Sequence, residues 1–180
     1  MREAVLVVEH SWDGQPLPEP DCTRFTLTRD EAHLVVQVEA PFRDDPPPPA
    51  PPGPTDRLWE YEVAELFLLG DDQRYLEIEL GPHGHHLVLE LHGPRNVLRS
   101  GMALDYTVTR EGGRWRGRAR VPTAWLPPGL CAANAYTIAG TGAERRYAAA
   151  CPVPGPAPDF HRIAPGKTVR ELLRHLVVAG

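Results

Sequence analysis

The chain has 180 residues, of which 42% are hydrophobic and 24% charged, and its net charge at pH 7 is -5. This composition is ordinary for a globular protein, and the length predicts a single domain over residues 1–180. Because the chain has neither a basic excess nor an apolar run of about 20 residues, we expect no nucleic-acid partner and no membrane partner.

The first part of the chain predicts three β-strands. The stretches "AVLVVEH" (4–10), "TRFTLTR" (23–29) and "HLVVQVEA" (33–40) are rich in alternating and β-branched residues, and turn-rich segments separate them. The segment around the first strand has no small-residue cleavage site of a secretory signal peptide, so we expect a cytoplasmic protein.

Residues 41–57, "PFRDDPPPPAPPGPTDR", predict a proline-rich loop. Proline has no N–H for a β-ladder and favours an extended polyproline conformation. We interpret the segment as a loop inside the single domain and not as a domain boundary. Because such segments dock onto aromatic grooves, a protein-interaction module is one alternative function.

The stretch "LWEYEVAELFLLG" (58–70) can form a helix, from its Glu and Ala content, or a buried strand. Its residues alternate in two sets, Val63, Glu65 and Phe67 against Ala64, Leu66 and Leu68. Because its neighbours on the chain are strands, we predict a central strand. Glu65 is then a carboxylate among apolar residues, which costs several kcal/mol unless it meets an Arg, a His or a ligand hydroxyl.

The stretch "YLEIELGPHGHHLVLELH" (75–92) predicts a β-hairpin that turns at "GPHG". If the turn is centred near residues 82 and 83, His86 lies across from Glu79 on the polar face. The surrounding histidines, His83, His85, His86 and His92, form a weak metal-ligand pattern. Imidazoles at a solvated turn more often bind nothing, so we expect no metal.

Two carboxylates of this hairpin, Glu77 and Glu79, project from one face of its first strand. A pair of carboxylates can act as the acid and the nucleophile of a glycosidase. With Glu65 they define a second alternative function, an enzyme that acts on a small sugar-like substrate. Paired surface glutamates are common, however, and the chain has no nucleophile elbow, Walker loop, dinucleotide fingerprint or zinc-protease motif. We therefore expect a non-catalytic protein without a cofactor.

The stretch "LDYTVTREGGRWRGRARVP" (104–122) predicts a second hairpin with a Gly-Gly turn. One face of its second strand has an arginine stripe, which consists of Arg114, Arg116, Arg118 and Arg120. The stripe could bind an anion or a nucleic acid. We expect instead that it forms salt bridges with the carboxylates of the first hairpin, Glu77, Glu79 and Glu90.

The last part of the chain predicts two more strands, "AYTIAGTG" (135–142) and "RRYAAACP" (145–152), and then a short helix in "KTVRELLRHLVVAG" (167–180). Thr168 and Glu171 form a capping-box signal at the start of that helix. Many short strands with frequent turns predict an all-β fold, because one face of each sheet must be buried against another. We predict a two-sheet antiparallel β-sandwich with a short C-terminal helix.

Aromatic side chains near the predicted turns are candidates for ligand stacking, and they are Trp12, Trp59, Tyr61, Tyr75, Tyr147 and Phe160. Flat rings stack on the apolar faces of sugars and of other planar ligands, while carboxylates and arginines bind the hydroxyls. The alternative role of each ring is packing in the core, which is the commoner one.

Five ordered motifs, "EHSWDG" (9–14), "APFRDDPPPP" (40–49), "LWEYEVAELFLLG", "YLEIELGPHGHHLVLEL" and "PDFHRI" (158–163), resemble an uncharacterised protein family found in bacteria and animals. The fold of that family is similar to carbohydrate-binding module family 9 and to DOMON-like domains, which are β-sandwiches. In the sugar-binding modules a Trp precedes the central strand and a Glu six residues later binds sugar hydroxyls. An Arg on a following strand assists, and a second Trp closes an aromatic sandwich.

The resemblance implies a binding site with substitutions. Trp59 and Glu65 match the first Trp and the Glu, His86 falls about where the Arg would lie, and Phe160, or less closely Tyr147, replaces the second Trp. We therefore predict a non-catalytic domain that binds a saccharide or another small polar ligand. The predicted binding residues are Trp59 and Phe160 for stacking, Trp12 as a further aromatic, and Glu65, Glu79, His86 and Arg118 for hydrogen bonds.

Overall fold

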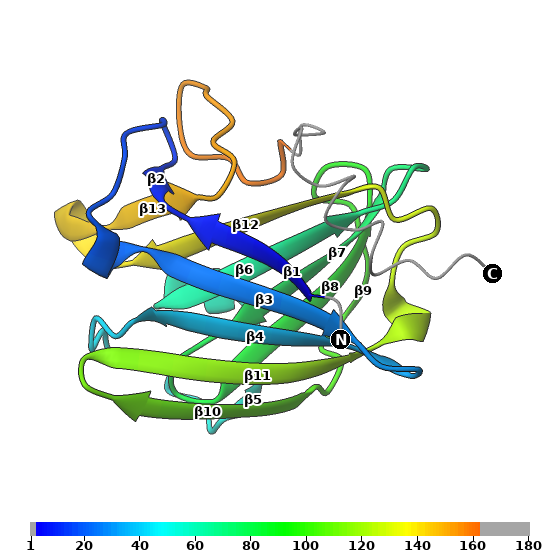
Figure 1. The fold of residues 1–180 in the computed structure, drawn as a ribbon, viewed down its shortest axis with the longest axis horizontal. Helices are drawn as coiled ribbons and strands as arrows, with labels where there is room; N and C mark the ends of the chain where they lie inside the picture. The colour runs from blue at the N-terminus through cyan, green and yellow to red at the C-terminus, as the bar shows by residue number, and fades with distance from the viewer. Residues whose placement is uncertain (1–2, 163–180) are drawn as a thin grey trace.

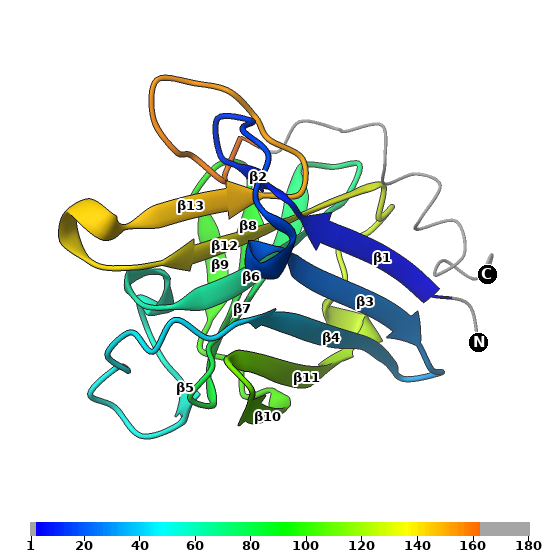
Figure 2. The ribbon, with the colours of Figure 1, turned by 60° about the vertical axis from the view of Figure 1, so that its left-hand side comes forward.

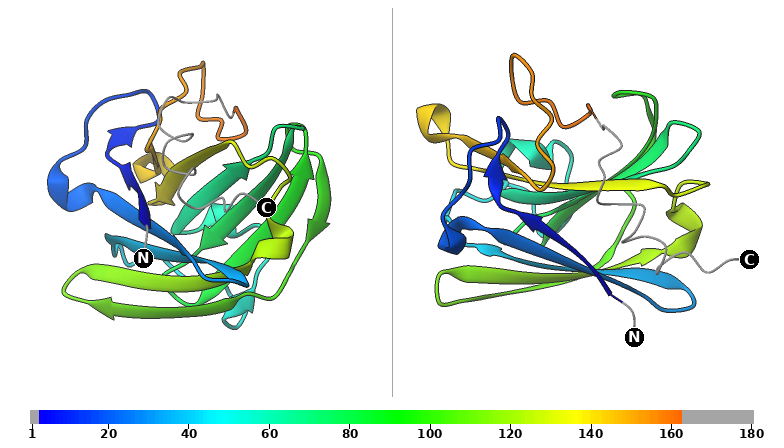
Figure 3. Two further views of the ribbon diagram at one scale, coloured as in Figure 1. Left: turned by 45° about the vertical axis from the view of Figure 1, so that its right-hand side comes forward. Right: turned by 45° about the horizontal axis from the view of Figure 1, so that its top comes forward.

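The computed structural model describes residues 3–162, which form two β-sheets packed face to face. Figure 1 shows the five-stranded sheet in front of the eight-stranded one, and the right-hand view of Figure 3 shows them as two layers. The predicted all-β sandwich is confirmed. The predicted C-terminal helix lies outside the described residues, and within residues 3–162 no helix is long and apolar enough to cross a membrane.

The five-stranded sheet is antiparallel throughout. Its strand order is β1 (Glu3–Val8), β3 (Thr23–Arg29), β4 (His33–Pro41), β11 (Arg114–Pro122) and β10 (Asp105–Glu111). The three strands predicted in the first part of the chain and the second predicted hairpin belong to this sheet, except that the first strand ends at Val8 and His10 belongs to β2 of the other sheet.

The eight-stranded sheet contains the segments that were ambiguous in the sequence. Its order is β2 (His10–Ser11), β13 (Arg146–Ala149), β12 (Ala132–Ala139), β6 (Val63–Leu69), β7 (Arg74–Leu80), β8 (His85–His92) and β5 (Gly53–Pro54), with β9 (Val97–Ser100) also paired to β8. The stretch 63–69 is therefore a central strand, as predicted. Only β5 pairs in parallel among the described strands.

Four short 3-10 helices connect the strands, and they are η1 (Glu19–Asp21), η2 (Leu58–Glu60), η3 (Thr123–Trp125) and η4 (Gly142–Glu144). Between η1 and η2 runs the proline-rich loop that follows β4. The loop is attached to the sheet, because Gly53 and Pro54 pair with β8 and His85 Nε2 lies 2.8 Å from the carbonyl oxygen of Ala50.

The main core lies between the sheets and follows from the alternation of apolar residues. Its largest fully buried side chains include Trp115 and Phe25 of the five-stranded sheet and Leu66 and Ile78 of the eight-stranded sheet. The residues between these on β6 and β7 project from the opposite face of the eight-stranded sheet.

That outer face of the eight-stranded sheet is also buried. A second apolar cluster covers it, with Phe67, Tyr75 and Tyr136 at its centre and with Tyr147 and Phe160 packed against it. Phe160 belongs to the segment 150–162, which Figure 2 shows in orange as a long loop that begins where β13 ends. Residues 75–80 of β7 are thus buried on both faces, so the polar face expected for the first strand of the hairpin 75–92 is not solvated.

Candidate ligand-binding cavity

Three carboxylates meet on the outer face of the eight-stranded sheet. Glu65 of β6 is directly opposite Glu79 of β7, and Glu77 lies two residues before Glu79 on the same face. One oxygen from each of the three side chains can be chosen so that all lie within 4.8 Å of one another. We call these three residues the carboxylate cluster.

The carboxylate cluster is buried, and its charge has little compensation. Glu65, Glu77 and Glu79 are 2%, 3% and 0% exposed. Within residues 3–162 no hydrogen-bond partner reaches Glu65 Oε1, Glu77 Oε2 or either carboxylate oxygen of Glu79. Buried unpaired carboxylates are expensive, and like charges directly opposite one another on a sheet repel.

This environment disfavours the ionised forms. Burial raises the pKa of Glu65 well above its usual range, and the charge of Glu77 raises it further. Burial likewise raises the pKa of Glu79, with the charges of Glu65 and Glu77 as further causes, and it raises the pKa of Glu77 to about 7. The environment therefore favours the protonated forms of the cluster unless a cation or a hydrogen-bond donor enters.

A cavity of about 410 Å³ opens above Glu65 and Glu77. Its lining residues are Trp59, Glu65, Phe67, Glu77, Leu89, Leu91, Arg95, Val97, Ile138, Tyr147, Pro158, Asp159, Phe160 and His161. This volume is within the range of small-molecule sites, and the mixture of aromatic rings with few convergent polar groups is typical of them. Trp59, at the edge in η2, is 38% exposed and so presents its ring to solvent.

The segment 158–162 covers part of the cavity, and ion pairs hold it in place. Asp159 binds Arg95 Nη2 at 2.7 Å and Arg162 Nε at 3.3 Å. Although burial alone would raise it, the pKa of Asp159 is lowered by its hydrogen bond to Arg95. Phe160 stacks on Tyr136 with the ring centroids 4.0 Å apart, and its carbonyl oxygen accepts a hydrogen bond from the Tyr136 hydroxyl.

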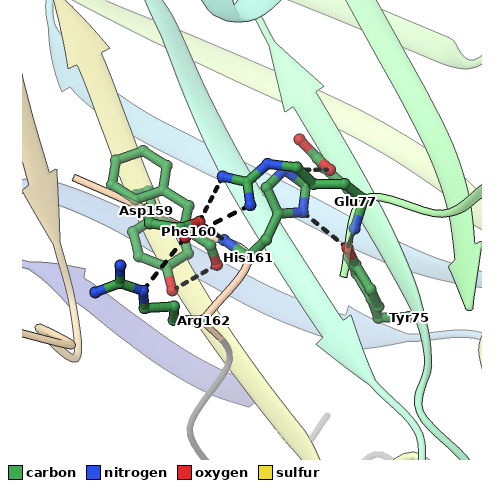
Figure 4. Close-up of polar contacts among 8 residues, drawn as sticks. Tyr75, Glu77, Asp159, Phe160, His161 and Arg162 are labelled. Atoms are coloured by element: carbon green, nitrogen blue, oxygen red, sulfur yellow. Dashed lines mark hydrogen bonds and ion pairs between the residues drawn. The ribbon is translucent and has the colours of Figure 1, made fainter. Parts of the chain in front are cut away.

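His161 connects this covering segment to the carboxylate cluster. Figure 4 shows its ring between Tyr75 and Glu77, with Nδ1 2.7 Å from the Tyr75 hydroxyl and Nε2 4.0 Å from Glu77 Oε2. Burial lowers the pKa of His161 to about 4, so the imidazole is neutral at pH 7 and does not neutralise Glu77. Tyr75 also accepts the N–H of Arg95, which fixes its hydroxyl.

The structure brings together four of the seven predicted binding residues. Trp59, Glu65 and Phe160 line the cavity, and Glu79 lies beside Glu65 on the paired strand, outside the lining. The sequence prediction did not include Arg95, Asp159 or His161, and it named Tyr75 only as one of several aromatic candidates for stacking. The sequence signal for Asp159 and His161 was the motif "PDFHRI", from which the prediction took only Phe160.

His86 is outside the cavity, and its predicted position opposite Glu79 is wrong. Glu79 pairs with Leu87, and His86 pairs with Leu80, whose side chain belongs to the core between the sheets. There His86 Nε2 accepts the N–H of Leu104 at 3.0 Å, and its ring meets the edge of Tyr106. His86 is therefore a packing residue.

Arg118 is also outside the cavity, because β11 belongs to the other sheet. Its side chain is exposed beside Gln37 and Thr107, its partners in register on β4 and β10. The salt bridges expected for the arginine stripe do form, but with different carboxylates. Arg114 and Arg116 bind Glu39, and Arg120 binds Asp30.

Trp12 lines a different cavity, of about 270 Å³, which shares Ile138 and Tyr147 with the first one. The histidines of the first hairpin are separated as well. His83 contacts Arg110, His85 contacts Ala50 and His86 contacts Leu104. Among residues 3–162 the group with potential metal-ligand geometry is the carboxylate cluster, which contains no histidine.

The comparisons with known proteins give both sequence relatives and structural neighbours. No family model matches the chain. The chain is 42% identical to the UPF0462 protein C4orf33 homolog of Mus musculus over 166 residues, which is 87% of this chain and 85% of the relative. It is 41% identical to the UPF0462 protein C4orf33 of Homo sapiens over 164 residues, with 86% and 81% covered.

Two solved structures are reported as neighbours, and only the first has a TM-score above 0.5. One is the crystal structure of a candidate carbohydrate-binding protein from Bacteroides uniformis. Its TM-score is 0.66 and its sequence identity 14%, and the alignment covers 92% of this chain and 83% of that chain. The other is a family 9 carbohydrate-binding module from Caldicellulosiruptor kristjanssonii in complex with cellotriose, with a TM-score of 0.45, 12% identity, and 71% and 64% covered. At 14% identity, the likeness to the Bacteroides uniformis protein shows the fold alone. The sequence relatives show more: the chain belongs to the UPF0462 family.

Proposed function

We propose that the protein is a non-catalytic binding domain that holds a saccharide or another small polar ligand in the cavity above Glu65. The observation on which this proposal depends is that Trp59, Glu65 and Phe160, which are far apart in the sequence, line one cavity. The same cavity contains ionic groups of both signs at its rim, Arg95 and Asp159.

The chemistry of the cavity fits a polyhydroxylated molecule. An exposed indole such as that of Trp59 offers a flat apolar face on which a sugar ring can stack. Glu65 and Glu77 below it are acceptors without sufficient donors, and ligand hydroxyls would supply those donors. A hydroxyl that donates to Glu65 would remove part of the cost of burying that carboxylate.

The fold supports the proposal at a coarser level. The structural neighbour with the TM-score of 0.66 is described as a candidate carbohydrate-binding protein, which is a statement about that protein. For this chain the neighbour supports a sandwich of the kind used for ligand binding, and the choice of a saccharide depends on the side chains of the cavity.

A thermal-shift screen of mono- and disaccharides tests the proposal. We expect at least one saccharide to raise the melting temperature of the wild-type protein and not that of Trp59→Ala. Far-UV circular dichroism checks that Trp59→Ala retains the β-fold.

The matched control is Trp12→Ala, because Trp12 lines the neighbouring cavity and not this one. It should respond to the ligand as the wild type does. An equal response of Trp59→Ala and wild type would remove Trp59 from the site, and a response lost only in Trp12→Ala would move the site to the neighbouring cavity.

The alternatives from the sequence stay predictions with tests of their own. An enzyme that uses Glu65, Glu77 and Glu79 would turn over chromogenic glycosides, and each Glu→Gln change would abolish that turnover. An interaction module would lose a partner when residues 46–54 are deleted. The cytoplasmic location also stays a prediction.

A further inference from the structure

Glu79 is the least explained residue of the carboxylate cluster. It is fully buried, and among the described residues nothing donates a hydrogen bond to either of its carboxylate oxygens. It does not line the cavity, so a ligand stacked on Trp59 would not reach it directly. A buried carboxylate aimed at two others needs a bound species of positive charge or a proton.

We propose that Glu65, Glu77 and Glu79 together bind one divalent metal ion of the oxygen-preferring class, with Ca²⁺ as the best fit. Three carboxylates supply three negative charges at one point, and a divalent ion offsets two of them. Carboxylate oxygens are the ligands that Ca²⁺, Mg²⁺ and Mn²⁺ prefer, and no sulfur or imidazole belongs to the cluster in the described part of the chain.

The spacing of the oxygens fits this class of ion. Two oxygens bound to one ion lie at most twice the metal–oxygen distance apart, which is about 4.2 Å for Mg²⁺ and about 5 Å for Ca²⁺. The selected oxygens of the cluster lie within 4.8 Å of one another, so they can surround Ca²⁺ with little movement. The strands β6 and β7 hold all three residues, which keeps the site rigid.

The ion would have open coordination positions toward the cavity. Ca²⁺ takes about 6–8 oxygen ligands, and three carboxylates supply at most six. Glu65 and Glu77 line the cavity, whereas Glu79 does not, so the free positions would lie on the side of Glu65 and Glu77, toward the ligand space. This step rests on the proposed function. Ligand hydroxyls, or water in their absence, would complete the coordination shell of the ion.

The competing explanation is a shared proton. If Glu79 is protonated, it can donate a hydrogen bond to Glu77, and two of the three groups then need no cation. A metal ion and a shared proton make opposite predictions for the effect of divalent ions, so one titration separates them.

The experiment is a Mn²⁺ titration of chelator-treated protein at pH 7.5, with free Mn²⁺ measured by electron paramagnetic resonance. We expect one tight site per chain, which added Ca²⁺ displaces, and an affinity for Mn²⁺ that falls by about tenfold or more in Glu79→Gln. Glu65→Gln is a second variant with the same expected loss. The control is Glu90→Gln, since Glu90 is on the neighbouring strand but pairs with Arg99.

A wild-type protein that binds no Mn²⁺ up to millimolar concentration would overturn the proposal in favour of the shared proton. Equal Mn²⁺ binding by wild type, Glu79→Gln and Glu65→Gln would also overturn it, because the ion would then lie elsewhere. Trp59→Ala should bind Mn²⁺ as the wild type does while losing the saccharide response. Failure of the saccharide proposal would appear in the thermal-shift response, and failure of the metal proposal would appear in the Mn²⁺ titration, so the two can be told apart.

Discussion

Replacing Glu79 with Gln in the metal-free protein should stabilise the fold. Most changes at a fully buried residue destabilise a protein, so this direction is a specific consequence of the carboxylate cluster. Gln has nearly the shape of Glu, and it removes the charge that lies directly opposite Glu65 and two residues from Glu77. The amide can also donate hydrogen bonds to the oxygens of Glu65 and Glu77 that lack a partner.

The size of the effect follows from the geometry. Two unit charges held 4.8 Å apart repel by about 3.5 kcal/mol at an effective dielectric constant of about 20. Protonation limits this cost in the wild type, so we expect a gain of about 1–2 kcal/mol in the free energy of unfolding. For a protein of this size such a gain raises the melting temperature by roughly 3–6 °C.

The pH at which the gain develops is also set by the structure. The folded-state pKa of Glu77 is raised to about 7 from an ordinary value of 4.5, and the pKa values of Glu65 and Glu79 are raised as well. A carboxyl whose pKa is raised on folding destabilises the fold progressively as the pH rises from the unfolded-state value through the folded-state value. The gain from Glu79→Gln should therefore be largest at pH 8 and shrink at pH 5.

The assay is differential scanning calorimetry in excess chelator at pH 8 and pH 5, with wild type, Glu79→Gln and Glu90→Gln compared. Glu90 pairs with Arg99 at the surface, so its substitution should change the melting temperature little. If Glu79→Gln melts below the wild type at pH 8, the description of the cluster as mutually repelling carboxylates is refuted.

Three further predictions concern residues around the site and in the core. Phe160→Ala removes the ring stacked on Tyr136, so the free energy of unfolding measured with urea should fall by about 1–3 kcal/mol. The saccharide-induced thermal shift should also be lost, and an unchanged shift would remove Phe160 from the site. His86→Gln should flatten the loss of stability as the pH falls from 7, because burial lowers the pKa of His86 and the unfolded chain therefore takes up its proton more readily than the folded one; an unchanged slope would contradict the burial of this ring. Gly117→Ala should lower the free energy of unfolding measured with urea by about 1–3 kcal/mol, since its Cβ would lie 2.8 Å from the Tyr106 hydroxyl and 2.9 Å from Val38 Cγ1. An unchanged free energy of unfolding would contradict close packing of Tyr106 and Val38 over this glycine.

The strands could be predicted because hydrophobic alternation depends on local sequence. The stretch 63–69 is the informative case, since its Glu and Ala content favours a helix while its position between strands made β6 the correct prediction. What alternation cannot show is whether the polar face of a strand is solvated. Glu77 and Glu79 resemble surface residues in the sequence, yet both are buried, because a second apolar cluster that includes Phe67, Tyr75 and Phe160 covers that face.

The errors in the predicted site have two physical causes. A shift of one residue in the register of the first hairpin moves His86 from the face of Glu79 to the opposite face, because side chains alternate along a strand. Arg118 was misplaced because local periodicity does not say which sheet a strand joins, and β11 joins the sheet without the cavity. Trp59 and Glu65 were predictable because both precede or belong to one strand and the motif resemblance placed them together.

A titration of the ¹⁵N-labelled protein with the saccharides of the screen, followed through the tryptophan indole resonances, tests whether a saccharide binds beside Trp59. The chain has four tryptophans, so Trp12, Trp115 and Trp125 are internal controls for Trp59. We expect a bound saccharide to shift the indole resonance of Trp59 and to leave that of Trp115, which is buried in the core between the sheets, unchanged. A shift of Trp12 without Trp59, or no shift of any indole at millimolar saccharide, would contradict this expectation.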